Sequence, residues 1–126
     1  MSDNRPKRIL VIEDELSIAL LLEALLEEEG FEVLCTETGA DGLAAHAESP
    51  FDVAIVDYGL PDTNGLQVLR ALGEGPSKAI PRRILATGWN NFNEGDLEGL
   101  VDAVLDKPFK LSHVVQVVKR LAANTI

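Results

Sequence analysis

The segment DVAIVDYGLPDTNG, residues 52–65, decides the fold of this chain. Four consecutive apolar residues, 53–56, lead directly into Asp57, and a run of turn-forming residues follows. A short apolar run bounded by polar and turn residues is typical of a strand buried on both faces of a sheet. We therefore predict a strand over 52–56 that delivers the carboxylate of Asp57 to its carboxyl end.

The same pattern, a short apolar run followed by a helical period, recurs on both sides of this segment. The predicted strands are 9–12, 31–36, 52–56, 83–86 and 103–105. The predicted helices are 16–29, 40–48, a stretch around 66–72, a short helix at 97–101, and 112–121. Gly30 stands where a helix end needs a positive φ. Parallel strands need crossover connections of this length, so the sequence predicts an α/β fold: a doubly wound, five-stranded parallel sheet with helices on both faces.

Length and charge restrict the classes of protein that fit. A chain of 126 residues with 46% hydrophobic residues is expected to form one domain over 1–126, with a flexible basic arm at 1–7 and a tail at 122–126. Eleven basic against 21 acidic residues give a net charge of −10, which disfavours direct binding to nucleic acid. The lone Cys35 cannot form an internal disulfide, no leader pattern opens the chain, and no apolar run approaches the ~20 residues of a membrane span. We expect a cytoplasmic protein that does not insert into membranes.

Charged and hydroxyl side chains follow the predicted strands. They are Glu13 and Asp14, Asp57, Thr87, and Lys107. The carboxyl ends of parallel strands meet at one edge of the sheet, where such carboxylates would repel one another unless a divalent cation or Lys107 neutralised them. Oxygen ligands without nearby His or Cys suit Mg²⁺. A carboxylate beside Mg²⁺, a lysine and a threonine is equipped to attack a phosphoryl donor, and Asp57 is the candidate nucleophile.

Four ordered motifs resemble those of receiver domains of two-component response regulators, which have a flavodoxin-like (βα)5 fold. They are VIEDE, VDYGLPDTNG, ATG and DKPF, and together they span nearly the whole chain. The resemblance implies that Asp57 accepts a phosphoryl group from a sensor histidine kinase or a histidine phosphotransfer protein. It implies Mg²⁺ ligation by Asp14, Asp57 and the main-chain carbonyl of Gly59, with Glu13 acting through a water.

The resemblance also assigns roles around the acceptor. Lys107 would bind a phosphoryl oxygen, with its position fixed by a cis bond to Pro108, and Thr87 would turn inward to the phosphoryl group. Pro61 and Gly65 would shape the loop after the acceptor. The output would be a changed surface formed by the segment after Thr87 together with the last strand and helix, and a downstream target protein would bind it. Such a domain catalyses only its own phosphorylation and autodephosphorylation.

Several alternatives stay open. A phosphatase that uses DxD chemistry would need a second Asp where this chain has Gly59. Val104 occupies the place where receivers usually carry Tyr or Phe, which keeps a non-phosphorylated adaptor as the alternative function. Leu20 is either an isolated surface residue or part of a docking face for a four-helix kinase domain. Trp89 and Phe92 either fill a local pocket or form an apolar patch for a partner.

Overall fold

The computed structural model describes residues 5–76, 79–88 and 97–123, and within them the strands form one parallel sheet. The strands are β1 (Arg8–Ile12), β2 (Glu32–Thr36), β3 (Val53–Asp57), β4 (Arg82–Thr87) and β5 (Ala103–Asp106). They lie in the order β2-β1-β3-β4-β5, and each neighbouring pair is parallel. The strand order therefore reverses direction between β1 and β3, which is the place where parallel sheets of this kind form their binding crevice.

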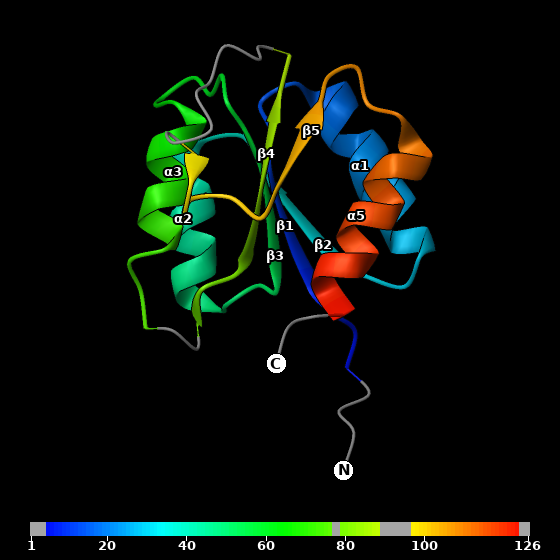
Figure 1. Cartoon of the computed structure of the whole chain (residues 1–126), viewed down its shortest axis with the longest axis horizontal. Coiled ribbons are helices and arrows are strands. Elements are labelled where there is room, and N and C mark those ends of the chain that lie inside the picture. Colours follow the sequence, from blue (N-terminus) through cyan, green and yellow to red (C-terminus); the bar gives the residue numbers. More distant parts are fainter. Residues whose placement is uncertain (1–4, 77–78, 89–96, 124–126) are drawn as a thin grey trace.

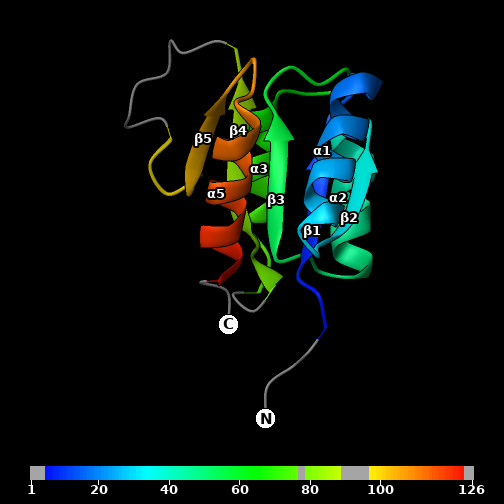
Figure 2. The same cartoon turned by 90° about the vertical axis from the view of Figure 1, so that its right-hand side faces the viewer.

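Helices cover both faces of the sheet, as predicted. They are α1 (Leu16–Glu28), α2 (Gly39–Glu48), α3 (Gly65–Leu72) and α5 (Leu111–Ala123). Helices α1 and α5 lie on one face, and α2 and α3 lie on the other (Figure 1). The view from the side shows the same layers, with α5 and α1 in front of the strands (Figure 2). The doubly wound α/β architecture is confirmed.

Local sequence explains where several helices begin and end. The Oγ1 of Thr38 accepts a hydrogen bond from the Asp41 N–H at 3.0 Å, and the Oδ1 of Asn64 accepts one from the Gln67 N–H at 3.0 Å. These side chains satisfy free amides at the starts of α2 and α3. Gly30 has φ +96° directly after α1, a conformation that favours glycine.

Alternate residues of each central strand contribute to two separate cores. In β1, Ile9 and Val11 pack with α1 and α5, whereas Leu10 and Ile12 pack with α2 and α3. β3 divides in the same way, and all of its residues are buried. Burial on both faces accounts for the nearly continuous apolar runs in the sequence.

The structure corrects two predicted boundaries. Helix α5 runs to Ala123 with Ala122 buried, so the tail predicted from residue 122 starts too early; alanine favours helix and continues the buried face. The helix predicted at 97–101 is wrong: Leu97 to Val101 forms a hydrogen-bonded turn, and Gly99 has φ +78°, which a continuing helix does not allow. Among the described residues, no helix is both long and apolar enough to cross a bilayer.

Candidate functional site

Three carboxylates gather beyond the carboxyl ends of β1 and β3. The parallel register pairs Ile12 with Val56, so the residues that follow them, Glu13 and Asp57, emerge next to each other. Oxygen atoms of Glu13, Asp14 and Asp57 all lie within 4.8 Å of one another. Glu13 and Asp57 are buried, with 3% and 8% of their surface exposed, whereas Asp14 is exposed. The predicted acidic cluster therefore exists, with one side open to solvent.

Lys107 reaches this cluster from the end of β5. Its Nζ lies 2.6 Å from Oε1 of Glu13 and 2.9 Å from Oδ1 of Asp57. The Lys107–Pro108 peptide bond is cis, as the resemblance implies, and the Lys107 N–H donates a hydrogen bond to the Thr87 carbonyl at 3.0 Å. One ammonium group thus bridges the two buried carboxylates.

Burial and charge shift the acid–base behaviour of this pair in opposite ways. Burial raises the pKa of Glu13 above its usual range, although the hydrogen bond from Lys107 works against the shift. Burial alone would lower the pKa of Lys107, but hydrogen bonds to Glu13 and Asp57 and their charges raise it overall. Lys107 therefore stays cationic at neutral pH and supplies the positive charge of the site.

Thr87 is the last residue of β4 and is 3% exposed. β4 pairs with β3, and Asp57 is opposite Ala86, so Thr87 lies one residue beyond the acceptor carboxylate on the neighbouring strand. The residues predicted to act together, from Glu13 to Lys107, thus converge at one edge of the sheet.

The loop after Asp57 turns sharply back to start α3. The Gly65 N–H donates to the Tyr58 carbonyl at 2.7 Å, and Gly59 forms an antiparallel bridge with Asn64. A Cβ on Gly65 would lie 2.5 Å from the Asp57 carbonyl oxygen. Gly65 is therefore required by this close approach, in agreement with its predicted role in shaping the loop. Pro61 is exposed in the same loop.

Sequence reasoning missed the part that Asp62 takes in this loop. Its carboxylate accepts hydrogen bonds from the Gly39 N–H at 2.9 Å and the Ala40 N–H at 3.0 Å. These bonds from the first turn of α2 lower the pKa of Asp62. The loop that carries the acceptor is thereby tied to the start of a helix far from it in sequence. Its acidic residue gave no signal, because an Asp in a turn usually bonds within the turn.

The donor set fits a hard divalent cation. All three side chains offer carboxylate oxygens, and the exposed Asp14 leaves one side open, as Mg²⁺ needs to keep several waters. Asp14, Asp57 and the Gly59 carbonyl would hold the ion, and Lys107 already compensates Glu13. Such an ion would supply charge neutralisation for an incoming anion.

Comparison with known proteins agrees with this arrangement. The family model described as "Response regulator receiver domain" matches residues 9–119. This chain belongs to the response regulator receiver domain family. The assignment confirms the resemblance that the four motifs indicate and places the acidic cluster in a known type of signalling domain.

Two curated relatives are transcriptional regulators. The chain is 32% identical over 122 residues to the transcriptional regulatory protein ResD of Bacillus subtilis, covering 96% of this chain and 50% of ResD. It is 34% identical over 118 residues to the TorCAD operon transcriptional regulatory protein TorR of Escherichia coli O157:H7, covering 92% of this chain and 50% of TorR. The chain thus spans about half the length of these relatives.

Solved structures share both fold and sequence with the chain. A CheY-like receiver domain protein from Methanospirillum hungatei has a TM-score of 0.83 at 28% identity, covering 95% of this chain and 96% of that one. The response regulator TrrA from Thermotoga maritima, solved in complex with Mg(2+)-BeF, has a TM-score of 0.82 at 29% identity, covering 91% of this chain and 98% of TrrA.

The predicted partner residues differ in outcome. Leu20 is 53% exposed on α1, as expected. Leu21, which the helical period assigned to the buried face, is 45% exposed, because Ala19, Leu22 and Leu26 form the buried stripe instead. Trp89 and Phe92 lie outside the described residues.

Proposed function

We propose that this domain accepts a phosphoryl group on Asp57 from a phosphohistidine of a sensor histidine kinase or a histidine phosphotransfer protein. The observation that carries the proposal is the position of Lys107 Nζ, 2.9 Å from Oδ1 of Asp57, in a cluster whose other carboxylates suit Mg²⁺. In this proposal Asp14, Asp57 and the Gly59 carbonyl bind the ion, and Glu13 acts through a water.

The transfer breaks one P–N bond and forms one P–O bond. An oxygen of Asp57 attacks the phosphorus, and the donor imidazole leaves with the electron pair of the P–N bond. Lys107 then moves its hydrogen bond from the Asp57 carboxylate to a phosphoryl oxygen, while Glu13 keeps the ammonium in place. The hydroxyl of Thr87 donates to another phosphoryl oxygen. Hydrolysis of the resulting acyl phosphate by water would reset the domain.

The signal would leave through the surface next to Thr87. An inward turn of Thr87 would move the segment that follows β4, and with it the surface of β5 and α5. We propose that a downstream protein reads this surface and that the domain works in the cytoplasm. Phosphotransfer itself would require no membrane insertion and no direct contact with nucleic acid.

The decisive experiment is intact-mass measurement after treatment with acetyl phosphate or phosphoramidate in MgCl2. We expect the wild-type chain to gain one phosphoryl group, and both the Asp57→Asn variant and the wild type in EDTA to gain none. Equal uptake by the wild type and Asp57→Asn would overturn the assignment of Asp57.

An adaptor that binds its partner without phosphorylation is the second candidate. It is favoured by Val104, which is 38% exposed on β5 and carries no aromatic ring to move with Thr87. The two functions separate in a binding assay with a captured partner. Equal affinity of the partner for the wild type, Asp57→Asn and the phosphorylated protein would support the adaptor, and a change on phosphorylation would support the switch.

A further inference from the structure

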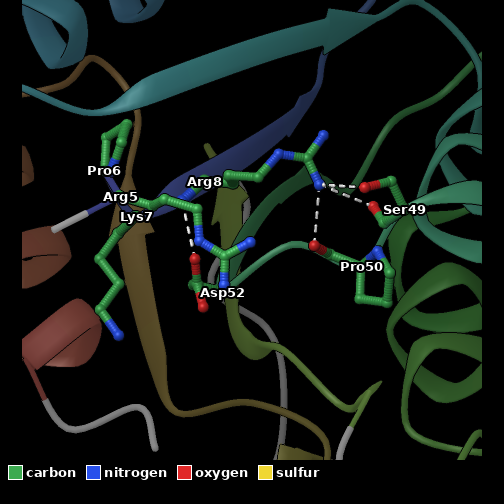
Figure 3. Close-up of a pocket in the computed structure, with 7 residues that line it drawn as sticks. All are labelled: Arg5, Pro6, Lys7, Arg8, Ser49, Pro50 and Asp52. Atoms are coloured by element: carbon green, nitrogen blue, oxygen red, sulfur yellow. Dashed lines mark hydrogen bonds between the residues drawn. The ribbon is translucent and has the colours of Figure 1, made fainter. Parts of the chain in front are cut away.

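A second hollow lies at the opposite end of the sheet, at the amino ends of β1 and β3 (Figure 3). Its volume is about 350 Å³, and Arg5, Pro6, Arg8, Ser49, Pro50 and Asp52 line it. The residues come from the arm before β1 and from the α2–β3 connection. Neither the phosphorylation site nor its loop contributes to it.

Arg8 forms a fixed wall of this hollow. Its Nη1 donates to the Ser49 carbonyl at 3.0 Å, to the Ser49 Oγ at 2.8 Å and to the Pro50 carbonyl at 2.9 Å (Figure 3). Its Nε lies 2.6 Å from a carboxylate oxygen of Glu32, and its guanidinium is 4.2 Å from the centre of the Phe51 ring. A guanidinium held by this many contacts loses little further entropy when a ligand binds.

The charge of the lining is opposite to that of the chain. Arg5, Lys7 and Arg8 contribute three positive charges against one negative charge from Asp52, a balance of 3 − 1 = +2, whereas the whole chain carries −10. Asp52 is itself engaged, because its Oδ2 accepts the Arg8 N–H at 2.7 Å. The hollow is therefore a local positive site on an acidic protein.

The polar groups of the hollow can donate hydrogen bonds. The Ser49 oxygen accepts from Arg8, so its hydroxyl proton is left to donate to a ligand. Arginine donates through a planar fork that matches carboxylate and phosphate oxygens. The rings of Pro6 and Pro50 add rigid apolar sides.

We infer that this hollow binds a small oxyanion with at least two negative charges, through Arg5, Arg8 and the Ser49 hydroxyl. The volume is at the lower end of the range for small-molecule sites, which suits a compact ligand with clustered phosphate or carboxylate oxygens. Phosphate esters and polycarboxylates share this chemistry, and the test distinguishes them.

The hollow is separate from the phosphorylation site. β1 and β3 each have five residues, so the two ends of the strands are about 15 Å apart at roughly 3.3 Å per residue. Arg8 begins β1, which leads to Glu13 and Asp14, and Asp52 precedes β3, which ends in Asp57. An oxyanion bound at one end would leave the Mg²⁺ ligands free.

The test is a titration of the ¹⁵N-labelled chain with pyrophosphate, citrate and acetate at constant ionic strength without Mg²⁺, followed by NMR. We expect pyrophosphate or citrate, but not the monovalent acetate, to shift amide signals of residues 5–8 and 49–52, and to leave those of Glu13, Asp57 and Lys107 unchanged. Response to pyrophosphate alone would assign a phosphorylated ligand, and response to citrate alone a polycarboxylate.

Matched variants separate a built site from general attraction. Arg5→Gln and Ser49→Ala should each weaken binding by about tenfold, the usual effect of losing a hydrogen bond to a charged group. Arg120→Gln removes the same charge from the exposed side of α5 and should leave binding unchanged. Uptake of phosphate on Asp57 should be unaffected in all three variants.

Three results would overturn the inference: no response to any of the anions at 10 mM, an equal response to acetate, or equal weakening by Arg120→Gln and Arg5→Gln. Because Arg5 precedes β1 and Ser49 keeps its main-chain bond to Arg8, folding of both variants can be verified by their unchanged amide spectra elsewhere.

Discussion

The ammonium of Lys107 and the carboxylate of Asp57 lie 2.9 Å apart at the ends of β5 and β3, two strands that are not neighbours in the sheet. β4 separates them, so the long lysine side chain has to extend across the end of that strand. The same ammonium is 2.6 Å from Glu13, which is 3% exposed. The stability of the site without metal therefore depends on this one positive charge.

Replacing Lys107 by alanine should destabilise the metal-free chain. Glu13 would remain buried without its partner, and breaking a buried ion pair costs about 3–5 kcal/mol of the free energy of unfolding. Urea unfolding in EDTA measures this loss, and addition of MgCl2 should recover part of it. Lys119→Ala is the control, because Lys119 pairs with Glu29 at 2.6 Å on the surface, where loss of a pair costs about 1 kcal/mol or less. Equal effects of the two variants would contradict the central role of Lys107.

Gly65→Ala should be much more harmful than Gly59→Ala. A Cβ at position 65 would lie 2.5 Å from the Asp57 carbonyl oxygen and 2.8 Å from the Tyr58 Cα, whereas a Cβ at position 59 meets no atom within 4 Å. Both glycines belong to the loop that positions the acceptor. We expect Gly65→Ala to lose about 1–3 kcal/mol of unfolding free energy and Gly59→Ala to lose little. Thermal unfolding of the two variants decides it, and a more stable Gly65→Ala would show that the loop relaxes freely.

The convergence of the site was predictable because it follows from strand geometry. Parallel strands deliver their following residues to one edge, so the order of apolar runs was enough to place Glu13, Asp57, Thr87 and Lys107 together. The register confirms this directly, since it pairs Ile12 with Val56. Where the sequence pattern is set by burial on both faces, the structure agrees with it.

Features that depend on loop conformation or helix rotation were not predictable. Leu21 falls outside the buried stripe because in an apolar run such as ALLL several helix rotations bury similar numbers of leucines. Sequence alone favoured a structural role for His46, but its partners are the Ala79 carbonyl at 2.5 Å and the Phe51 N–H at 3.1 Å, which come from two different loops. Such long-range polar contacts have no periodic signature in the sequence.

Asp62 should make the stability of the chain depend on pH. Its pKa is lowered from 3.8 by hydrogen bonds from the Gly39 and Ala40 amides, so its contribution is fully present above the pKa of the unfolded chain and is lost as the pH falls through the folded value. We expect Asp62→Ala to lower the urea midpoint at pH 7, with the difference from wild type shrinking below about pH 4. Asp62→Asn keeps an acceptor oxygen and should be intermediate. A difference that stays constant from pH 7 to pH 3 would contradict this origin.

Cys35 should react slowly with alkylating reagents. Burial, together with the charges of Glu23 and Glu27, raises the pKa of its thiol to about 11 from an ordinary 9.0. The thiol donates to the Ala19 carbonyl at 3.5 Å. Because the thiolate is the reactive form, alkylation by iodoacetamide at pH 8 should be about 100-fold slower than in the urea-unfolded chain. Equal rates in the folded and unfolded chain would show that the thiol is neither shielded nor shifted.

Leu20→Ala should slow phosphotransfer from a cognate kinase while leaving uptake from small donors unchanged. Leu16 and Leu20 are one helical turn apart on α1 and are 63% and 53% exposed, so both present apolar surface that a helical partner could cover. Leu34→Ala removes a comparable exposed side chain, 43% exposed on the edge strand β2, and serves as the control. Stopped-flow transfer from the purified phosphorylated kinase measures the rate, and acetyl phosphate measures the intrinsic reactivity of Asp57. Since Leu20 touches neither Asp57 nor its metal ligands, a loss with both donors would indicate a folding defect. Unchanged transfer from the kinase would leave Leu20 as an isolated surface residue.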